Sequence, residues 1–281
     1  MEVPLLTLVP VGGLANRMKA IAAAMRLSEQ TGASLQILWF RDAGLGCRFS
    51  DLFCLLPSFP NGGALKEATW TDVLLRDRSR LSNLFFPSLV RRFRYDRCID
   101  EYQTARLMTE GADFASLCRD RRVWMASYVY FLTRSDRDIP TDSFDPFRPV
   151  PSLQERIDAQ AAAMGHNVVG VHIRRTDNVV SIQQSPTALF EERMSQEPAD
   201  TIFYLATDSE EVKMQMRRRF GERVQTLHRQ AERGTLQGMQ DALVELYLLA
   251  RCRHILGSAG STFSMTAASI GRVSLEILCR S

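Results

Sequence analysis

The sequence predicts an α/β protein made of two Rossmann-like domains, with parallel sheets that face a cleft. The chain has 281 residues, about the length of two domains. Apolar strand-like runs alternate with amphipathic helical patterns near both ends, and a proline-rich segment lies between these regions. Strands that alternate with helices are typical of parallel sheets covered on both faces. Such sheets bind ligands outside the carboxyl ends of their strands.

The N-terminal half begins with a strand–helix–strand pattern. An apolar run ends in two glycines, a helical pattern ends at Gly32, and a second apolar run follows. We expect strands at 5–11, 35–40 and 123–130 and helical stretches near 100–118. The segment 41–120 is otherwise interpreted as an irregular insertion.

The C-terminal half alternates more regularly between helical and strand-like patterns. We expect helices at 153–164, from Pro186, from Asp208 to Gly221, at 238–251 and at 261–270. We expect strands at 167–173, 201–206, 224–227, 254–256 and 273–278. The prolines between 138 and 151 predict a linker, which gives domains at 1–150 and 151–281.

Composition and charge exclude several classes of protein. The net charge of +3 is far from that of a basic nucleic-acid-binding domain, so we expect no nucleic-acid partner. The six cysteines form no CxxC pair and the four histidines are dispersed, so we expect free thiols and no metal. The chain lacks an apolar run of about 20 residues and a basic N-terminal region, which favours a cytoplasmic protein. The basic run Arg91, Arg92 and Arg94 leaves a peripheral membrane contact open.

Gly12 and Gly13 follow the first predicted strand. Two glycines let a ligand approach the backbone closely, and the start of a helix offers free N–H groups to an anion. Asn16 and Arg17 add side-chain donors in the first turn. An arginine there opposes the helix dipole, so we expect Arg17 to face a partner. A plain tight turn is the alternative explanation of the two glycines.

Two adjacent arginines follow the strand at 167–173. Side-chain alternation places His172 and Arg174 on one side of the strand end and Arg175 on the other. Paired guanidinium groups suit a diphosphate. The alternative is a surface ion cluster of Arg174 and Arg175 with Asp177.

A third candidate segment follows the strand at 254–256. Ser261 and Thr262 can supply hydroxyl groups beside the free N–H groups of a helix start, and Phe263 follows them. A simple helix cap is the alternative. On the helix at 238–251, Asp241 and Glu245 share a face, and Glu245 is a candidate for a hydrogen bond to a base or ribose. A solvated helix charge is the alternative for Glu245.

Several of these segments resemble known motifs. Gly13 to Arg17 resembles the GGLxNR opening of GDP-fucose-dependent fucosyltransferases, and His172 to Asp177 is similar to the HxRRTD peptide of the α1,6-fucosyltransferases. The segment 206–208 and the stretch 245–268 resemble later motifs of the same superfamily. The resemblance implies a GT-B-like fold and inverting, metal-independent transfer of fucose from GDP-fucose to a saccharide or lipid-linked saccharide. The first domain would then be the acceptor side, and the second would bind the donor nucleotide.

The resemblance also implies roles for individual residues. Arg175 would hold the β-phosphate as the catalytic arginine, and Glu245 would reach the nucleoside. Further donor contacts are implied for His172, Arg174, Asp208, Ser261, Thr262 and Phe263. Contacts from the first domain are expected from Gly12, Gly13, Asn16 and Arg17.

The chain departs from the α1,6 pattern downstream of the arginine motif. The α1,6 enzymes carry an acidic residue there, a candidate general base, whereas residues 180–183 contain no carboxylate. Asp177 is the nearest alternative base. This departure keeps open a non-catalytic protein that binds a nucleotide sugar, and a transferase that uses another GDP-linked sugar. Asp136 and Asp138 match a metal-binding DxD by letters alone, and we interpret them as a solvated charge cluster.

Overall fold

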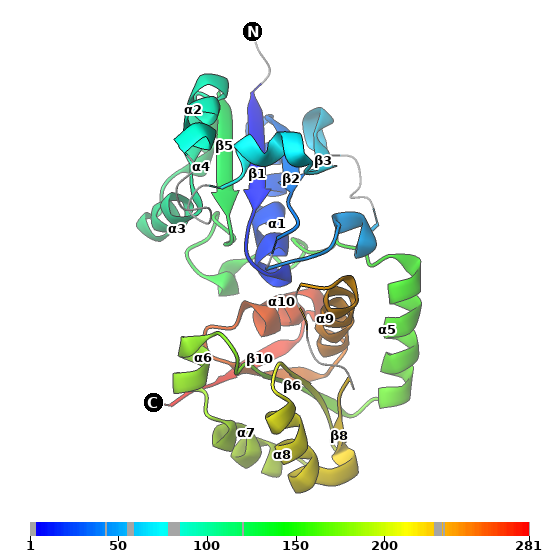
Figure 1. The fold of residues 1–281 in the computed structure, drawn as a ribbon. Coiled ribbons are helices and arrows are strands. Elements are labelled where there is room, and N and C mark those ends of the chain that lie inside the picture. Colours follow the sequence, from blue (N-terminus) through cyan, green and yellow to red (C-terminus); the bar gives the residue numbers. More distant parts are fainter. Residues whose placement is uncertain are drawn as a thin grey trace. The chain divides into compact units, whose positions relative to one another are not determined.

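The computed structural model describes residues 4–42, 44–54, 59–77, 85–119, 121–227, 232 and 234–280. The chain divides into two compact units, Met1–Arg148 (unit 1) and Pro149–Ser281 (unit 2). Each unit contains a five-stranded sheet in which every pair of neighbouring strands is parallel (Figure 1). The predicted α/β class with two parallel sheets is therefore confirmed.

Unit 1 has the strand order β3-β2-β1-β5-β4. Its strands are β1 (Leu5–Pro10), β2 (Ser34–Trp39), β3 (Ala64–Glu67), β4 (Arg97–Ile99) and β5 (Arg122–Ser127). Its α-helices are α1 (Leu14–Thr31), α2 (Phe85–Arg94), α3 (Glu101–Glu110) and α4 (Phe114–Cys118). Its short 3-10 helices are η1 (Phe49–Asp51), η2 (Pro60–Gly62), η3 (Trp70–Leu75) and η4 (Asp136–Asp138).

Two expectations for unit 1 need correction. The irregular insertion at 41–120 supplies β3 and β4, which are too short to show a clear alternation of side chains. The segment we interpreted as a linker packs on unit 1, because Phe144 and Phe147 are buried and the Phe147 ring lies 5.5 Å from the ring of Phe53. Pro140 and Pro146 lie at turns of this packed segment, and Pro151 is the first residue of α5.

Unit 2 has the strand order β10-β9-β6-β7-β8. Its strands are β6 (Val168–Ile173), β7 (Ile202–Thr207), β8 (Val224–Gln225), β9 (His254–Ser258) and β10 (Ser274–Leu278). Its helices are α5 (Pro151–Met164), α6 (Val179–Gln184), α7 (Thr187–Ser195), α8 (Glu210–Phe220), η5 (Gly221–Arg223), α9 (Leu236–Leu249) and α10 (Thr262–Gly271). The chain passes from β6 through β7 to β8 and then crosses to the other side of β6. The topological switch point therefore lies between β6 and β9.

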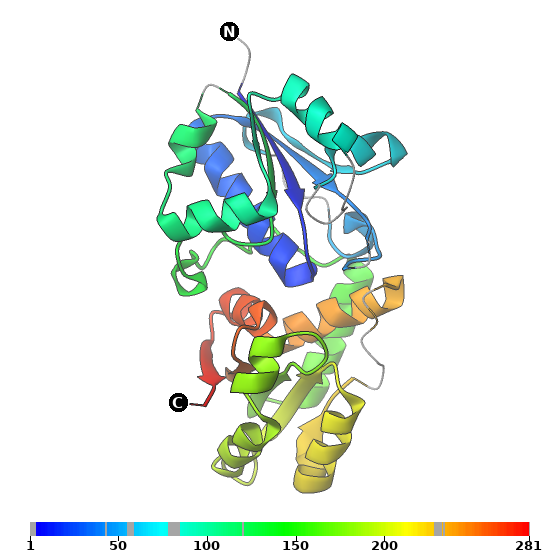
Figure 2. The same cartoon turned by 60° about the vertical axis from the view of Figure 1, so that its left-hand side comes forward.

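Helices cover both faces of the sheet of unit 2 (Figure 2). On one face, Val171 and Leu205 of the sheet share a buried core with Phe190 of α7 and Met216 of α8. On the other face, a Cβ atom added at Gly170 would lie 3.0 Å from Leu249 of α9. This alternation along β6 decides which helices each side chain at its end can reach.

Most predicted elements of unit 2 are present, with two differences. The sequence did not predict helix α6. Its apolar residues are exposed, so they do not recur at the helical spacing that marks a side facing the core. Helix α8 is capped by Ser209, whose hydroxyl accepts the Val212 N–H, and not by Asp208 as we expected. The Asp208 carboxylate is bonded to the loop after β6 instead.

Among the residues that the structure describes, no helix has both the length and the apolar character needed to cross a membrane.

The close approach of α9 and α10 predicts that Gly271→Ala destabilises unit 2. An added Cβ would lie 2.1 Å from the carbonyl oxygen of Ala250 at the end of α9. Such overpacking costs about 1–3 kcal/mol, which outweighs the ordinary gain from replacing a helical glycine. Chemical denaturation followed by circular dichroism measures the change. Gly234→Ala is the matched control, because its Cβ would meet open space; equal stability of the two variants would contradict the prediction.

Candidate active site

Three loops of unit 2 meet where β6, β7 and β9 end. The register pairs Ile173 of β6 with Thr207 of β7, and His172 of β6 with Gly257 of β9. Residues that directly follow these strands are therefore neighbours at one edge of the sheet. This edge includes the switch point, where parallel α/β sheets bind their ligands.

The Asp208 carboxylate organises this edge. It accepts the Arg175 N–H at 2.8 Å and the Thr176 N–H at 3.2 Å, and it also accepts the Thr176 hydroxyl. The Arg174 guanidinium lies 2.9 Å from the same carboxylate. Burial raises the pKa of Asp208, but the Thr176 hydrogen bonds and the charge of Arg174 outweigh it and hold the pKa below its ordinary value. Asp208 therefore stays ionised.

Arg174 lies between two carboxylates that differ in exposure. Its backbone N–H donates to the Ser258 hydroxyl at 3.2 Å, which joins the ends of β6 and β9. Its Nε donates to Asp177 at 2.8 Å on the side away from Asp208. The Asp177 side chain is 54% exposed and that of Asp208 is 8% exposed. Asp177 can therefore leave the guanidinium at a small cost, because water solvates its exposed carboxylate, whereas Asp208 would be left buried without its partner.

Arg175 points toward α7, on the opposite side of the strand end from His172, as alternation predicts. Its guanidinium donates to the Ser185 carbonyl at 2.6 Å, to the Arg174 carbonyl at 2.8 Å and to the Thr187 hydroxyl. Burial lowers the pKa of Arg175, and the Asp208 charge offsets part of that effect. A guanidinium has five N–H groups, and these bonds use at most four of them. Arg175 therefore stiffens the loop and keeps one donor for a ligand.

His172 is buried on the opposite face, against the start of α10. Its Nδ1 lies 3.3 Å from the Ser261 hydroxyl, and its ring centroid lies 5.0 Å from that of Phe263. Burial, with the nearby charge of Arg174, lowers the pKa of His172 to about 3. His172 is therefore neutral at pH 7 and offers a hydrogen bond without charge.

Ser261 occupies the N-cap position of α10, but its hydroxyl makes no capping hydrogen bond. It is directed to His172 instead. The first-turn N–H groups of α10 thus lack the side-chain acceptor that a simple cap would give them. Together with Thr262, they offer an anion-binding set beside Arg174.

The sequence reasoning missed the contacts that join the loops after β6 and β9. Asn178 donates to the Gly260 carbonyl at 2.9 Å, and Ser181 donates to the Ala259 carbonyl at 2.6 Å. The Ser185 hydroxyl accepts the Ala259 N–H at 2.8 Å. Asn178 also caps α6, so the Asn-x-x-Ser spacing was the available signal. These hydrogen bonds hold the loop after β6 and the loop after β9 in a fixed arrangement.

Glu245 lies on α9 and is buried, so the solvated alternative is wrong. Burial raises the pKa of Glu245 to about 8; Lys213 lowers it and Asp241 raises it. One oxygen of Asp241 accepts from Arg156 and Gln237. The other oxygen of Asp241 and the Tyr204 hydroxyl are buried without a hydrogen-bond partner in the described part of the chain. These two atoms therefore keep hydrogen-bonding capacity that the described residues do not use.

The candidates of unit 1 behave differently. Gly12 has φ +85°, a left-handed conformation that favours glycine, and its added Cβ would lie 3.0 Å from the Asn16 side chain. Arg17 is completely buried, and it donates to the Gly12 carbonyl at 2.9 Å and pairs with Asp42 at 2.9 Å. The partner that we expected for Arg17 is thus the protein itself, and Arg17 positions the loop that carries Gly13. Asn16 is half-buried at the start of α1.

The DxD letters also need a correction. Asp136 pairs with the buried Lys19 at 2.6 Å, so it is not simply solvated. Burial lowers the pKa of Lys19, and Asp136 opposes that effect. Among the described residues, no group of three or more His, Cys, Asp or Glu side chains is placed to hold a metal ion.

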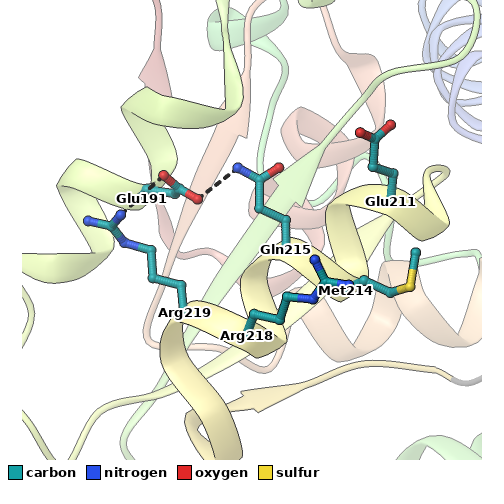
Figure 3. A pocket seen from close by; sticks show the side chains of 6 residues that line it. All are labelled: Glu191, Glu211, Met214, Gln215, Arg218 and Arg219. Carbon is teal, nitrogen blue, oxygen red and sulfur yellow. Dashed lines mark hydrogen bonds and ion pairs between the residues drawn. The ribbon is translucent and has the colours of Figure 1, made fainter.

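A separate surface pocket lies between α7 and α8 (Figure 3). It has a volume of about 450 Å³ and is lined by Glu191, Glu211, Met214, Gln215, Arg218 and Arg219. Glu191 accepts from Gln215 at 2.8 Å and pairs with Arg219 at 3.4 Å, so these two lining charges are paired with each other. It contains none of the predicted site residues.

Known proteins share this architecture. The chain is 25% identical over 276 residues to Nodulation protein Z of Bradyrhizobium diazoefficiens, covering 87% of this chain and 72% of that protein. A crystal structure of NodZ alpha-1,6-fucosyltransferase soaked with GDP-fucose is 18% identical, with a TM-score of 0.63, over 96% of this chain and 93% of the other. A mutant of Arabidopsis thaliana FUT1 in complex with GDP is 13% identical, with a TM-score of 0.64, over 100% of this chain and 71% of the other.

These similarities identify the class of protein by its fold: the chain has the GT-B-like fold of the fucosyltransferases. The family model described as Nodulation protein Z (NodZ) matches residues 10–275, and the chain belongs to this family. The match confirms the resemblance drawn from the motifs, and its range includes every candidate site residue.

The buried acid on α9 predicts a loss of stability in mild alkali. Between pH 4.5 and about 8, folded Glu245 keeps a proton that the unfolded chain has lost. Raising the pH through this window therefore lowers the free energy of unfolding by up to about 1.4 kcal/mol per pH unit. His172 acts in the opposite direction between about 3 and 6.5, so the interval from pH 6.5 to 8 isolates Glu245.

Denaturant unfolding at pH 6.5 and 8 tests this prediction. We expect Glu245→Gln to lose most of the decrease seen in the unaltered protein, whereas the exposed Glu155→Gln keeps it. An unchanged decrease in Glu245→Gln would show that another group titrates.

Proposed function

We propose that the protein transfers fucose from GDP-fucose to a saccharide acceptor, free or lipid-linked. The observation that carries this proposal is the arginine pair fixed by Asp208 at the switch point of unit 2, beside the start of α10. Membership of the NodZ family supports it. Structures of NodZ alpha-1,6-fucosyltransferase with GDP-fucose and with GDP also support it. Unit 2 then binds the donor nucleotide, and unit 1 is the acceptor side.

The donor diphosphate replaces Asp177 on Arg174. A phosphate offers the guanidinium a charged oxygen acceptor in place of the exposed carboxylate. Arg175 adds its remaining N–H to the β-phosphate, and the N–H groups at the start of α10 add further donors. These donors stabilise the negative charge of the departing GDP, which supports transfer without a divalent metal.

The nucleoside occupies the polar cluster at α9. Tyr204 and Asp241 present buried polar atoms there, and protonated Glu245 can donate as well as accept. His172 and Phe263, whose ring centroids lie 5.0 Å apart, add an uncharged contact for the donor at the end of β6.

Transfer proceeds with inversion at the anomeric carbon. The acceptor oxygen forms a bond to that carbon as the bond to the β-phosphate oxygen breaks and GDP leaves. The acceptor proton passes to a carboxylate. Asp177, once released from Arg174 by the donor, is the residue proposed for this role.

One observation favours a second candidate function. Residues 180–183 carry no carboxylate, and Val180 and Ile182 are exposed there. With Asp177 paired to Arg174, the site would then bind a GDP-linked sugar, fucose or another, without turning it over.

Thermal-shift titration tests the donor site. We expect GDP and GDP-fucose, but not UDP or ADP, to raise the unfolding midpoint, with or without EDTA, because a ligand of the folded state stabilises it.

Arg175→Ala should weaken GDP binding about 10- to 100-fold and abolish transfer, because a charged hydrogen bond is lost. Arg218→Ala removes an exposed arginine of α8 and is the matched control. Absence of any guanine-nucleotide shift would overturn the donor site, and a requirement for added metal would overturn metal independence.

Asp177→Ala separates transfer from binding. We expect GDP binding to be kept or slightly strengthened, because a competitor for Arg174 is removed. The rate of GDP release from GDP-fucose in the presence of oligosaccharide acceptors should fall about 10²- to 10⁴-fold. Asp158→Asn, an exposed carboxylate of α5, is the control. An unchanged rate would remove Asp177 as the base, and absence of turnover in the unaltered protein on every acceptor would favour the binding protein.

A further inference from the structure

Unit 1 exposes two large aromatic side chains on neighbouring helices. Trp70 at the start of η3 is 86% exposed, and Phe93 near the end of α2 is 89% exposed. Val73 and Leu89, about one turn from them on the same helices, are also exposed. Large exposed apolar patches on a folded protein often mark a site of contact with a partner or a membrane.

The packing of α2 explains why these side chains point outward. Arg91 is the buried residue of its last turns, with its guanidinium 4.0 Å from the centre of the Trp124 ring. It also donates to the Arg76 carbonyl at 3.0 Å, which joins α2 to the end of η3. Leu89 and Phe93 lie two residues on either side of Arg91, which places them on the opposite face of the helix. The fold thus uses Arg91 to hold α2 and leaves its apolar face exposed.

The same region is strongly basic. Helix α2 contains three arginines and no acidic residue, and Arg92 and Arg94 are exposed. The described residues 88–97 hold four arginines and one aspartate. This aspartate, Asp96, accepts the Arg122 N–H at 2.7 Å.

We propose that this surface docks the protein on an anionic lipid membrane. We name these exposed residues of the two contacting helices η3 and α2 the α2 surface: Trp70, Val73, Leu89, Arg92, Phe93 and Arg94. Aromatic and aliphatic side chains enter the boundary between headgroups and acyl chains, while arginines bind the headgroup phosphates. Arg91, which the sequence placed in a candidate membrane segment, takes no part because it is buried over Trp124.

Charge favours a membrane over a second copy of the chain. Two copies joined through the α2 surface would bring Arg92 and Arg94 of each against the same residues of the other, and like charges repel there. An anionic bilayer can attract these arginines with its headgroups and, at the same time, take up the exposed apolar side chains. This role lies in unit 1 and is independent of donor binding in unit 2.

Vesicle flotation tests the docking. The purified full chain is mixed with vesicles of phosphatidylcholine alone or of phosphatidylcholine with phosphatidylglycerol. We expect flotation with the anionic vesicles only, and weaker flotation at high salt. Phe93→Ser and Trp70→Ser should each lower partitioning about tenfold, and Arg92→Gln or Arg94→Gln about fivefold. Tyr102→Ser, an exposed aromatic of α3 outside the surface, should bind as the unaltered protein does.

Several outcomes would overturn the proposal. These are no flotation of the unaltered protein with anionic vesicles, equal flotation of all the variants, or a dimer in light scattering that Phe93→Ser dissociates without lipid. Each variant replaces an exposed side chain, so its unfolding midpoint should be unchanged. The GDP shift is measured in parallel, so loss of membrane binding is distinguished from failure of the donor site.

Discussion

One carboxylate holds the candidate active site together. Asp208 follows β7, and the parallel register of β6 with β7 places it beside the residues that follow Ile173. From there it binds the backbone of Arg175 and Thr176 and the side chain of Arg174. A one-residue slip in register would turn every side chain of β7 to the other face and separate these groups. The position of both arginines therefore depends on a sheet register that the apolar core of unit 2 fixes.

Burial shifts the pKa of three ionisable groups in unit 2, and the neighbours of each group decide whether it is charged at pH 7. Asp208 receives several hydrogen bonds and a guanidinium, so it remains charged although burial opposes it. His172 has a hydroxyl and an aromatic ring as neighbours, so burial makes it neutral. Glu245 has acidic residues nearby that counter the effect of Lys213, so it keeps its proton. The site thus keeps its charge on the arginines and on Asp208, while His172 and Glu245 supply uncharged hydrogen-bonding groups.

The sequence was most informative where interactions are local or follow strand ends. Apolar runs and turn residues predicted the elements of unit 2, and the position after β6 predicted the arginine cluster. The sequence could not predict ion pairs between residues that are far apart in the chain, such as Arg17 with Asp42 and Lys19 with Asp136. Short β3 and β4 show too few alternations to predict, and exposed α6 has no core-facing period. The contacts of Ser181 and Ser185 with the loop after β9 depend on the completed sheet.

The two carboxylates on Arg174 differ in what it costs to remove them. An exposed ion pair such as that of Asp177 is worth about 0–1 kcal/mol, so a diphosphate displaces it easily. Breaking a buried pair such as that of Asp208 costs about 3–5 kcal/mol, because a charge is left unpaired. On the proposed function, donor binding therefore releases Asp177 while Asp208 keeps the arginines in place. The carboxylate that balances Arg174 before the donor arrives is then the one available to accept a proton afterwards, which links base activity to the presence of GDP-fucose.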